Sequence, residues 1–186
     1  DENWQENIRR TIELDPESVT IYQMELPFNT VYSQDILGNR IETPVADWPT
    51  KRSWVDQAFR QLEEAGYHVS SAYTMVKNPD KVTFSYRDNL WMGSDLLATG
   101  IASFGHVSGV HYQNLPEWDD YVGALLDDDR LPLGRGNRPT DSQLLIREMI
   151  LQLKKGHLDA SYFEDKFSVD ILQQWDATWR GYQEEG

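Results

Sequence analysis

The residues best suited to chemistry lie in the stretch 95–106 and in the four polar residues 111–114 that follow it. An apolar run after Asp95 changes to small residues with glycines at Gly100 and Gly105, and then to histidine, tyrosine, glutamine and asparagine. Glycine lets a chain turn sharply or lets a ligand approach its backbone, and polar groups just beyond could hold an anion or a heterocycle. The alternative is a strand that ends in a glycine-rich turn with surface histidines, because short glycine motifs often occur without a site.

The sequence carries no catalytic motif of its own. Two of its four histidines, His106 and His111, are close in sequence, but they are not spaced i,i+4 and no acidic ligand accompanies them, so we expect no metal site. Cysteine is absent, which excludes a disulfide, a thiolate nucleophile and a cysteinyl iron–sulfur ligand from this chain. No serine elbow, Walker loop or dinucleotide fingerprint is present. The chain therefore offers a candidate site without catalytic residues.

The charge of the chain excludes several classes of partner. Its 186 residues include 31 acidic and 17 basic side chains, for a net charge of -14, which repels nucleic acid and anionic membranes. No apolar run approaches the roughly 20 residues of a membrane span, and no signal-peptide pattern is present. We expect a soluble, cytoplasmic protein with neither nucleic acid nor membrane as a partner. Because the chain begins inside a predicted helix, we expect it to be processed or to be a piece of a longer protein.

The first half of the chain alternates predicted helices and strands. Residues 1–14 and 47–65 have the apolar periodicity of amphipathic helices, and residues 18–24 and 68–76 are rich in β-branched and aromatic side chains. This order with short connections predicts parallel strands joined by crossover helices. Sites in such folds lie at the carboxyl ends of the strands. Here these ends are the segments after each strand and the stretch 95–106.

Two further segments of the first half allow two interpretations each. Residues 28–48 form a long irregular stretch, which is either functional or only partly ordered. Residues 81–86 are predicted as a short strand that leads into Arg87. This arginine could clamp a carboxylate with its two-pronged guanidinium group. The alternative is a structural ion pair with the adjacent Asp88.

The second half is predicted to be helical. Capping-box patterns at Asn114 with Glu117 and at Thr140 with Gln143 begin two predicted helices, and a final helix is predicted after Ser168. The connection between the first two contains three adjacent aspartates, interpreted as a surface run. It also contains a basic, glycine-rich loop at 131–139, which either receives an anionic substrate or only covers the end of the molecule.

Four segments resemble, in order, motifs of the oxygen-independent coproporphyrinogen III oxidase group of radical S-adenosylmethionine (SAM) enzymes, which includes haem chaperones. The segments are Tyr22-Gln23-Met24-Glu25-Leu26-Pro27-Phe28-Asn29-Thr30, Arg87-Asp88-Asn89-Leu90-Trp91, Asp95 to Phe104, and Tyr112-Gln113-Asn114. The corresponding family patterns are Tyr-Gln-Leu-x-x-Glu-Pro-x-Thr, the Arg-His-Asn…Tyr-Trp stretch of the chaperone branch, Asp-Leu-Leu-Gly-x-Gly-x-Ser-Ala, and Tyr-x-Gln-Asn. The resemblance covers residues 19–167.

The resemblance implies an α/β fold: the C-terminal part of an incomplete TIM-like radical SAM barrel, followed by a helical C-terminal extension. Residues 1–113 would be the last βα units of the barrel with its closing segment, and residues 114–186 the helical domain. The family's Cys-x-x-x-Cys-x-x-Cys and its glycine-rich SAM-binding segment are absent from this chain. Both would lie in the N-terminal half of a parent protein that binds SAM and a [4Fe–4S] cluster. We expect that half to be a partner, and we expect the fragment to self-associate, because an open barrel exposes strand edges.

The family's activity is the oxidative decarboxylation of coproporphyrinogen III propionates in anaerobic haem biosynthesis, through a 5′-deoxyadenosyl radical. By resemblance, the residues of the SAM and substrate pocket are Gly100, Ile101, Ala102, Ser103 and Phe104. The further candidates for its lining are Tyr22, Gln23, Tyr86, Arg87 and His106. None of these side chains can generate the radical. We therefore assign no catalytic residue and expect the chain alone to be inactive.

Two positions depart from the oxidase pattern. Residue 104 is Phe where an aliphatic residue is expected, and residue 86 is Tyr where the oxidase branch has Gln. Two alternatives to the oxidase therefore stay open. One is a haem chaperone or haem-modifying relative in the same family, with a tetrapyrrole ligand in either case. The other is a non-catalytic binding domain.

Overall fold

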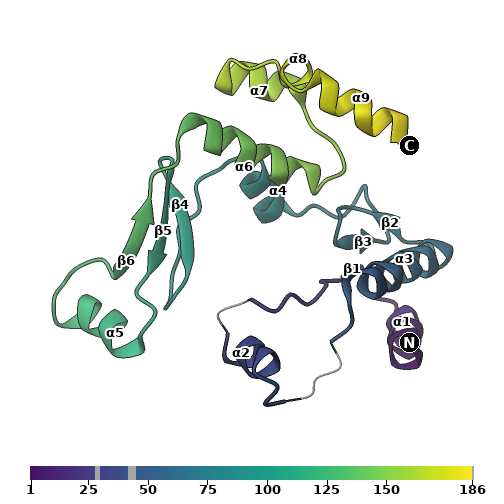
Figure 1. The fold of residues 1–186 in the computed structure, drawn as a ribbon, viewed down its shortest axis with the longest axis horizontal. Coiled ribbons are helices and arrows are strands. Elements are labelled where there is room, and N and C mark those ends of the chain that lie inside the picture. The colour runs from purple at the N-terminus through teal and green to yellow at the C-terminus, as the bar shows by residue number, and fades with distance from the viewer. Residues whose placement is uncertain (28–29, 42–44, 186) are drawn as a thin grey trace. The chain divides into compact units, whose positions relative to one another are not determined.

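The structure is a computed structural model that describes residues 1–27, 30–41 and 45–185. The chain forms two compact units, Asp1–Thr83 and Phe84–Gly186, whose elements are labelled in Figure 1. Phe28 and Asn29 of the first motif, and part of the irregular stretch 28–48, lie outside the described residues. The predicted domain division after residue 113 stays a prediction about a longer parent.

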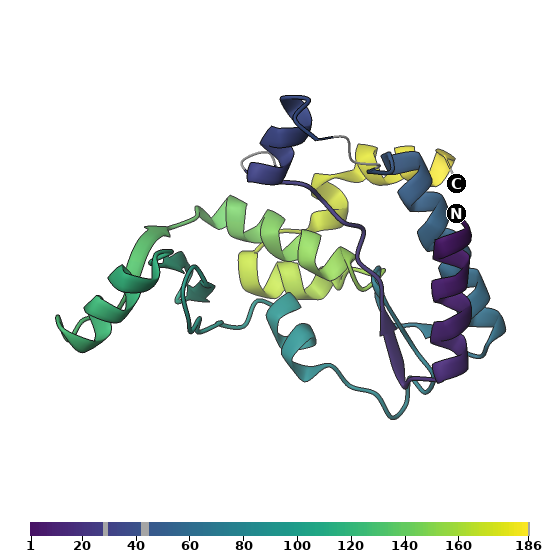
Figure 2. The same cartoon turned by 90° about the horizontal axis from the view of Figure 1, so that it is seen from below.

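The first unit packs two long helices on a small sheet. Helices α1 (Glu2–Leu14) and α3 (Trp48–Glu64) lie side by side in Figures 1 and 2, and both confirm predicted amphipathic helices. The other elements are β1 (Ser18–Thr20), α2 (Val31–Leu37), β2 (His68–Val69) and β3 (Thr74–Val76). The core gathers Leu62, Tyr67 and Met75, with apolar residues of α1 and β1 packed against them.

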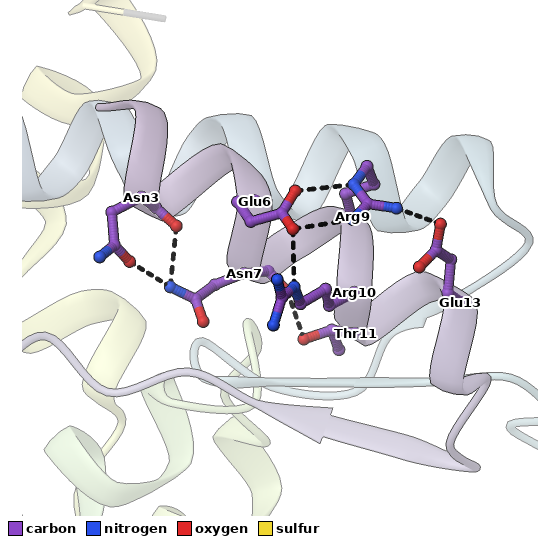
Figure 3. Close-up of polar contacts among 7 residues, drawn as sticks. All are labelled: Asn3, Glu6, Asn7, Arg9, Arg10, Thr11 and Glu13. Atoms are coloured by element: carbon purple, nitrogen blue, oxygen red, sulfur yellow. Dashed lines mark hydrogen bonds and ion pairs between the residues drawn. The ribbon is translucent and has the colours of Figure 1, made fainter.

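The helix ends of this unit follow from local sequence. The Asp47 side chain accepts a hydrogen bond from the backbone N–H of Thr50 at 2.9 Å, which caps the start of α3. Just after α3, Gly66 has φ +90, a left-handed conformation that favours glycine. On the outer surface of α1, Arg9 and Arg10 both donate to the carboxylate of Glu6 (Figure 3). These hydrogen bonds lower the pKa of Glu6 to about 2.

The parallel pairing expected for these strands is wrong. Strand β3 pairs antiparallel with both β1 and β2. The reason is a reversal inside 68–76, which was predicted as one strand. The backbone N–H groups of Ser70 and Ser71 both donate to the carbonyl of Thr74, so the chain turns back on itself and forms a hairpin. A barrel segment is not confirmed, because every strand pair in the described part of the chain is antiparallel.

The second unit joins a three-stranded sheet to a group of helices. Strands β4 (Phe104–Val107), β5 (Val110–Asn114) and β6 (Leu133–Asn137) form an antiparallel sheet in that order. Ser108 and Gly109 connect β4 to β5 with positive φ angles of 50 and 75, as a tight two-residue hairpin turn requires. The helices are α4 (Ser85–Trp91), α5 (Trp118–Leu126), α6 (Asp141–Leu153), α7 (Ala160–Phe167), α8 (Ile171–Gln174) and α9 (Asp176–Glu185).

A buried polar network holds α4, α6 and α7 together. The carboxylate of Glu148, on α6, accepts from the Tyr162 hydroxyl at 2.6 Å and from the Lys166 ammonium at 2.9 Å. Tyr162 also lies 2.8 Å from the carbonyl oxygen of Met92, at the end of α4. Beside this network is the apolar cluster of Leu145, Phe163 and Ile171. Figure 2 shows α6 and α7 side by side.

Several predictions for this unit need correction. Residues 81–86 do not form a strand, and Ser85 begins helix α4. The guanidinium of Arg87 lies 4.5 Å from the Phe84 ring centre and 5.2 Å from that of Trp91, and these i−3 and i+4 contacts favour a helix. The expected loop 131–139 contains β6, because its residues pair with β5.

The helix predictions of this unit are mostly confirmed. The capping box of Thr140 and Gln143 is present at the start of α6, and α5 lies where a helix was expected. The single final helix after Ser168 is two helices, α8 and α9, and α7 was not predicted. No described helix is long and apolar enough to cross a membrane.

Candidate functional site

The predicted central stretch folds into a loop, residues 97–103, which we call the glycine loop. Leu96 and His106 exchange two backbone hydrogen bonds, at 2.7 and 2.8 Å, so the chain leaves and re-enters the sheet at one place. Between them, Gly100 and Ala102 have positive φ angles of 92 and 55. The apolar run is not a buried strand, since Leu97 is 77% exposed.

Side chains from outside the loop fix its backbone. The hydroxyls of Tyr112 and Tyr121 accept from the N–H groups of Ala98, at 2.8 Å, and Gly100, at 3.0 Å. The amide nitrogen of Asn114 donates to the carbonyl of Gly100 at 2.9 Å. Asn114 is buried at the end of β5. The capping box predicted for Asn114 with Glu117 is therefore wrong, because the amide serves the loop and α5 has no side-chain cap.

Gly105 allows one of these contacts. A Cβ atom at this position would lie 2.2 Å from Cζ of Tyr112, far inside van der Waals contact. The Tyr112 ring therefore crosses the sheet over Gly105, its partner in the strand register, to reach the glycine loop. Gly105, which the sequence suggested as part of a ligand site, is needed for this close approach of two strands.

The opposite face of the same sheet carries a depression lined by polar and aromatic residues, which we call the sheet groove. Its side chains on that face are Phe104, His111, Gln113, Arg135 and Asn137, and its volume is about 280 Å³. Strand register places them together, because Phe104 pairs with Gln113, Gln113 with Arg135, and His111 with Asn137. An aromatic ring, a guanidinium group and amides thus share one surface.

Gln113 connects the groove to the glycine loop. Its amide nitrogen donates to the carbonyl of Ala102 at 3.0 Å, and its amide oxygen accepts from Nε of Arg135 at 2.7 Å. The side chain is held at both ends, so it fixes the guanidinium plane of Arg135. The left-handed backbone at Ala102 and the arginine in the groove are therefore positioned by one amide.

His106 and His111 form a close pair on this face. Their ring centres lie 4.3 Å apart, and His106 is only 4% exposed, so the alternative of surface histidines is wrong for His106. Burial, and then the positive charge of Arg147, lower the pKa of both imidazoles. No group of three or more potential metal-ligating side chains occurs among the described residues.

Two of the predicted pocket residues, Tyr22 and Gln23, lie in the first unit. They line an apolar pocket of about 250 Å³ beyond the end of β1, together with Trp4, Ile21, Met24, Val45, Ala46, Lys51, Trp54 and Val55. Lys51 donates to the carbonyl of Met24 at 2.7 Å, which fixes the backbone that follows the two residues. The strand predicted over 18–24 ends at Thr20, so Tyr22 and Gln23 lie beyond it, and their place in a SAM or substrate pocket stays a prediction.

The structure brings together only some of the other predicted residues. Gly100, Ile101, Ala102, Ser103 and Phe104 are continuous in the loop and at the start of β4, and His106 follows on the same strand. Tyr86 and Arg87 do not line the sheet groove. Arg87 forms an ion pair with Asp88 at 2.9 Å, which is the structural alternative considered above.

Sequence reasoning did not single out Tyr121. His111 belonged to the polar stretch 111–114, and Arg135 and Asn137 to the loop 131–139 that could receive an anion, but none of the three was assigned to the pocket. The signal for Arg135 and Asn137 is their i,i+2 spacing, which places both on one face of a strand. Glycines between them weakened the strand pattern.

The comparisons with known proteins give one result on the fold. Coproporphyrinogen III oxidase (HemN) from Escherichia coli, described as a radical SAM enzyme, superposes with a TM-score of 0.71 and 18% sequence identity. The match covers 94% of this chain and 42% of HemN. The chain has the fold of part of HemN.

The likeness to HemN confirms, at the level of the fold, the resemblance predicted from the motifs. The chain spans less than half of HemN's length, 42%, and it combines helices with two small sheets. No family model matches the chain, and no curated protein does so either. With no cysteine, the chain supplies no thiolate ligand to an iron–sulfur cluster.

Proposed function

We propose that this chain is the C-terminal half of a radical SAM enzyme of the coproporphyrinogen III oxidase type. The observation that carries this proposal is the fold likeness to HemN over 94% of the chain, together with motifs in the family's order. The preceding half would complete the barrel, bind the [4Fe–4S] cluster and be the structural partner of this chain. Without that half, the chain would self-associate and be inactive.

The chain fits a role in binding substrate and does not fit cluster binding. It has no cysteine to ligate iron, so no step is assigned to a cluster on these residues. Bound in the parent, the cluster and SAM would supply the radical that removes hydrogen from a substrate propionate. The residues of this chain would hold and orient the reacting molecules.

The glycine loop provides a rigid rim for this purpose. Asn114 and Tyr121 fix the peptide groups at Gly100, so the loop keeps its shape without a ligand. Ile101 and Phe104 remain exposed beside it and present an apolar surface to a flat ring. Preorganisation of this kind reduces the entropy that binding must overcome.

The test is to express this chain together with its upstream coding region, over roughly one further domain length. The extended protein, reconstituted anaerobically with iron and sulfide, should cleave SAM and consume coproporphyrinogen III. A variant lacking the upstream cluster cysteines is the matched control and should do neither. The 186-residue chain alone should also be silent.

Two outcomes would contradict the proposal. If the chain alone consumes SAM, its active residues have been misassigned. If the extended protein lacks the cysteine motif, or binds haem with a defined spectral shift and leaves coproporphyrinogen unchanged, the oxidase assignment fails. The second result would favour the haem chaperone alternative.

A further inference from the structure

The sheet groove carries the positive charge of Arg135 in an acidic protein. His111 also lines it, but burial and the charge of Arg147, on α6, lower the pKa of both His106 and His111 and so favour the neutral imidazoles. The chain as a whole has a net charge of -14. Yet none of the ion pairs found among the described residues includes Arg135 or Arg147. These arginines lack the carboxylate partner that an acidic chain could easily supply.

Nearby acidic side chains are already occupied. Asp95 and Glu148 are the two carboxylates whose charge acts on His106. Asp95 accepts from the backbone N–H of Ser108 at 2.9 Å, and Glu148 binds Tyr162 and Lys166. Neither carboxylate forms an ion pair with Arg135 or Arg147 among the described residues; Glu148 pairs with Lys166. The groove can therefore accept a carboxylate from another molecule.

Two buried atoms near the histidine pair also lack partners. Nδ1 of His106 and Nη1 of Arg147 are inaccessible to solvent and have no hydrogen bond within the described part of the chain. His106 contacts His111, which lines the groove, with ring centres 4.3 Å apart. Buried polar atoms are normally satisfied.

The geometry of Arg135 suits a carboxylate. Gln113 occupies Nε and fixes the guanidinium plane, and no described protein group binds the two terminal nitrogens. Their N–H groups form a fork that matches the two oxygens of a carboxylate. His111 and Asn137 add polar groups on the same surface. At the edge of the groove the Phe104 ring is 64% exposed, which leaves a flat apolar face for a planar ring.

We propose that the sheet groove binds a carboxylate through Arg135, with Phe104 in contact with the planar group that carries it. The carboxylate site stands on the geometry of the groove. Its ligand class, a side-chain carboxylate of a tetrapyrrole, rests on the proposed function. A second source of the same chemistry is the methionine carboxylate of SAM.

The experiment titrates the 186-residue chain with three probes by equilibrium dialysis. Coproporphyrin III carries four propionates, its tetramethyl ester has the same ring without charge, and SAM is the third probe. The variants are Arg135→Gln and the matched control Arg138→Gln, an exposed arginine outside the groove. Circular dichroism verifies that both variants fold.

We expect coproporphyrin III to bind, and R135Q to weaken its binding roughly tenfold to a hundredfold, the value of a charge-assisted hydrogen bond. R138Q should change it less than about twofold, as a surface charge does. The ester should bind the wild type as weakly as the acid binds R135Q. Arg135-dependent binding of SAM but not of coproporphyrin would support the carboxylate site and assign it to the cofactor.

Equal effects of R135Q and R138Q, or equal binding of acid and ester, would overturn the carboxylate site. Failure of the proposed function is separately visible. If the extended protein never cleaves SAM but Arg135-dependent carboxylate binding persists, the carboxylate site is supported and the oxidase assignment is rejected. If the extended protein is active and R135Q changes nothing in dialysis, the groove proposal falls alone.

Discussion

Asn114 donates from its side-chain nitrogen to the carbonyl oxygen of Gly100, 2.9 Å away. This bond ties the end of β5 to the turn of the glycine loop, fourteen residues earlier in the chain. Asn114 is buried, so its amide supplies this hydrogen bond from inside the protein. The shape of the loop that the motif predicted therefore depends on a residue outside it.

Replacing Asn114 should destabilise the second unit. Asn114→Ala removes the donor to the carbonyls of Ala98 and Gly100, and the loss of these hydrogen bonds costs about 1 kcal/mol. Urea unfolding followed by circular dichroism measures the loss. Asn137→Ala, at an exposed position on the neighbouring strand, is the control and should change stability by less than about 0.5 kcal/mol. Equal losses would show that Asn114 does not fix the loop.

The two glycines beside Tyr112 should respond differently to alanine. In Gly105→Ala the new Cβ would lie 2.2 Å from the Tyr112 ring, so the ring must move and lose its bond to Ala98. We expect a loss of about 2–3 kcal/mol. In Gly136→Ala the atom nearest to the new Cβ is 3.5 Å away, which is an ordinary contact. The free energy of unfolding should therefore stay unchanged. The prediction fails if the two thermal unfolding midpoints coincide.

The Glu148 network should contribute more to the free energy of unfolding than a surface ion pair does. Glu148 is 2% exposed, while the Lys166 side chain is 40% exposed. Solvent therefore screens the charge of Lys166 and weakens the ion pair. Glu148→Gln should therefore cost about 2 kcal/mol, below the 3–5 kcal/mol of a fully buried pair. Asp176→Asn, which breaks the exposed pair with Arg180, is the control and should cost less than about 0.5 kcal/mol. Chemical denaturation at neutral pH compares them.

Acidification should destabilise the protein through the histidine pair. Burial lowers the pKa of His106 and of His111 below the ordinary value of 6.5. Below pH 6.5 the unfolded chain therefore binds protons that the folded protein does not, so the free energy of unfolding falls as the pH decreases. Unfolding midpoints at pH 7.5, 6.5 and 5.5 test this. The double variant His106→Gln, His111→Gln should show a flatter dependence, and an unchanged slope would exclude the pair as its source.

The sequence by itself determined the elements whose signals are local. The helices α1, α3 and α6 follow from apolar periodicity, and the start of α6 follows from the capping box of Thr140 and Gln143. The end of α3 follows from Gly66. Each signal depends on residues within one or two helical turns, so the chain far away does not alter it. The absence of cluster ligands was likewise visible in the composition.

Only the tertiary structure decided the strands and the site. The sequence of a short strand does not indicate whether the strand pairs in a parallel or an antiparallel direction. The hairpin at Ser70 made the first sheet antiparallel. Residue Arg135 became a groove residue because β6 pairs with β5, which no local pattern expresses. Asn114 was predicted to be a helix cap, yet its amide donates to the Gly100 carbonyl in the loop. A polar side chain can hydrogen-bond to groups that are distant in sequence, and these groups come within reach only when the chain folds.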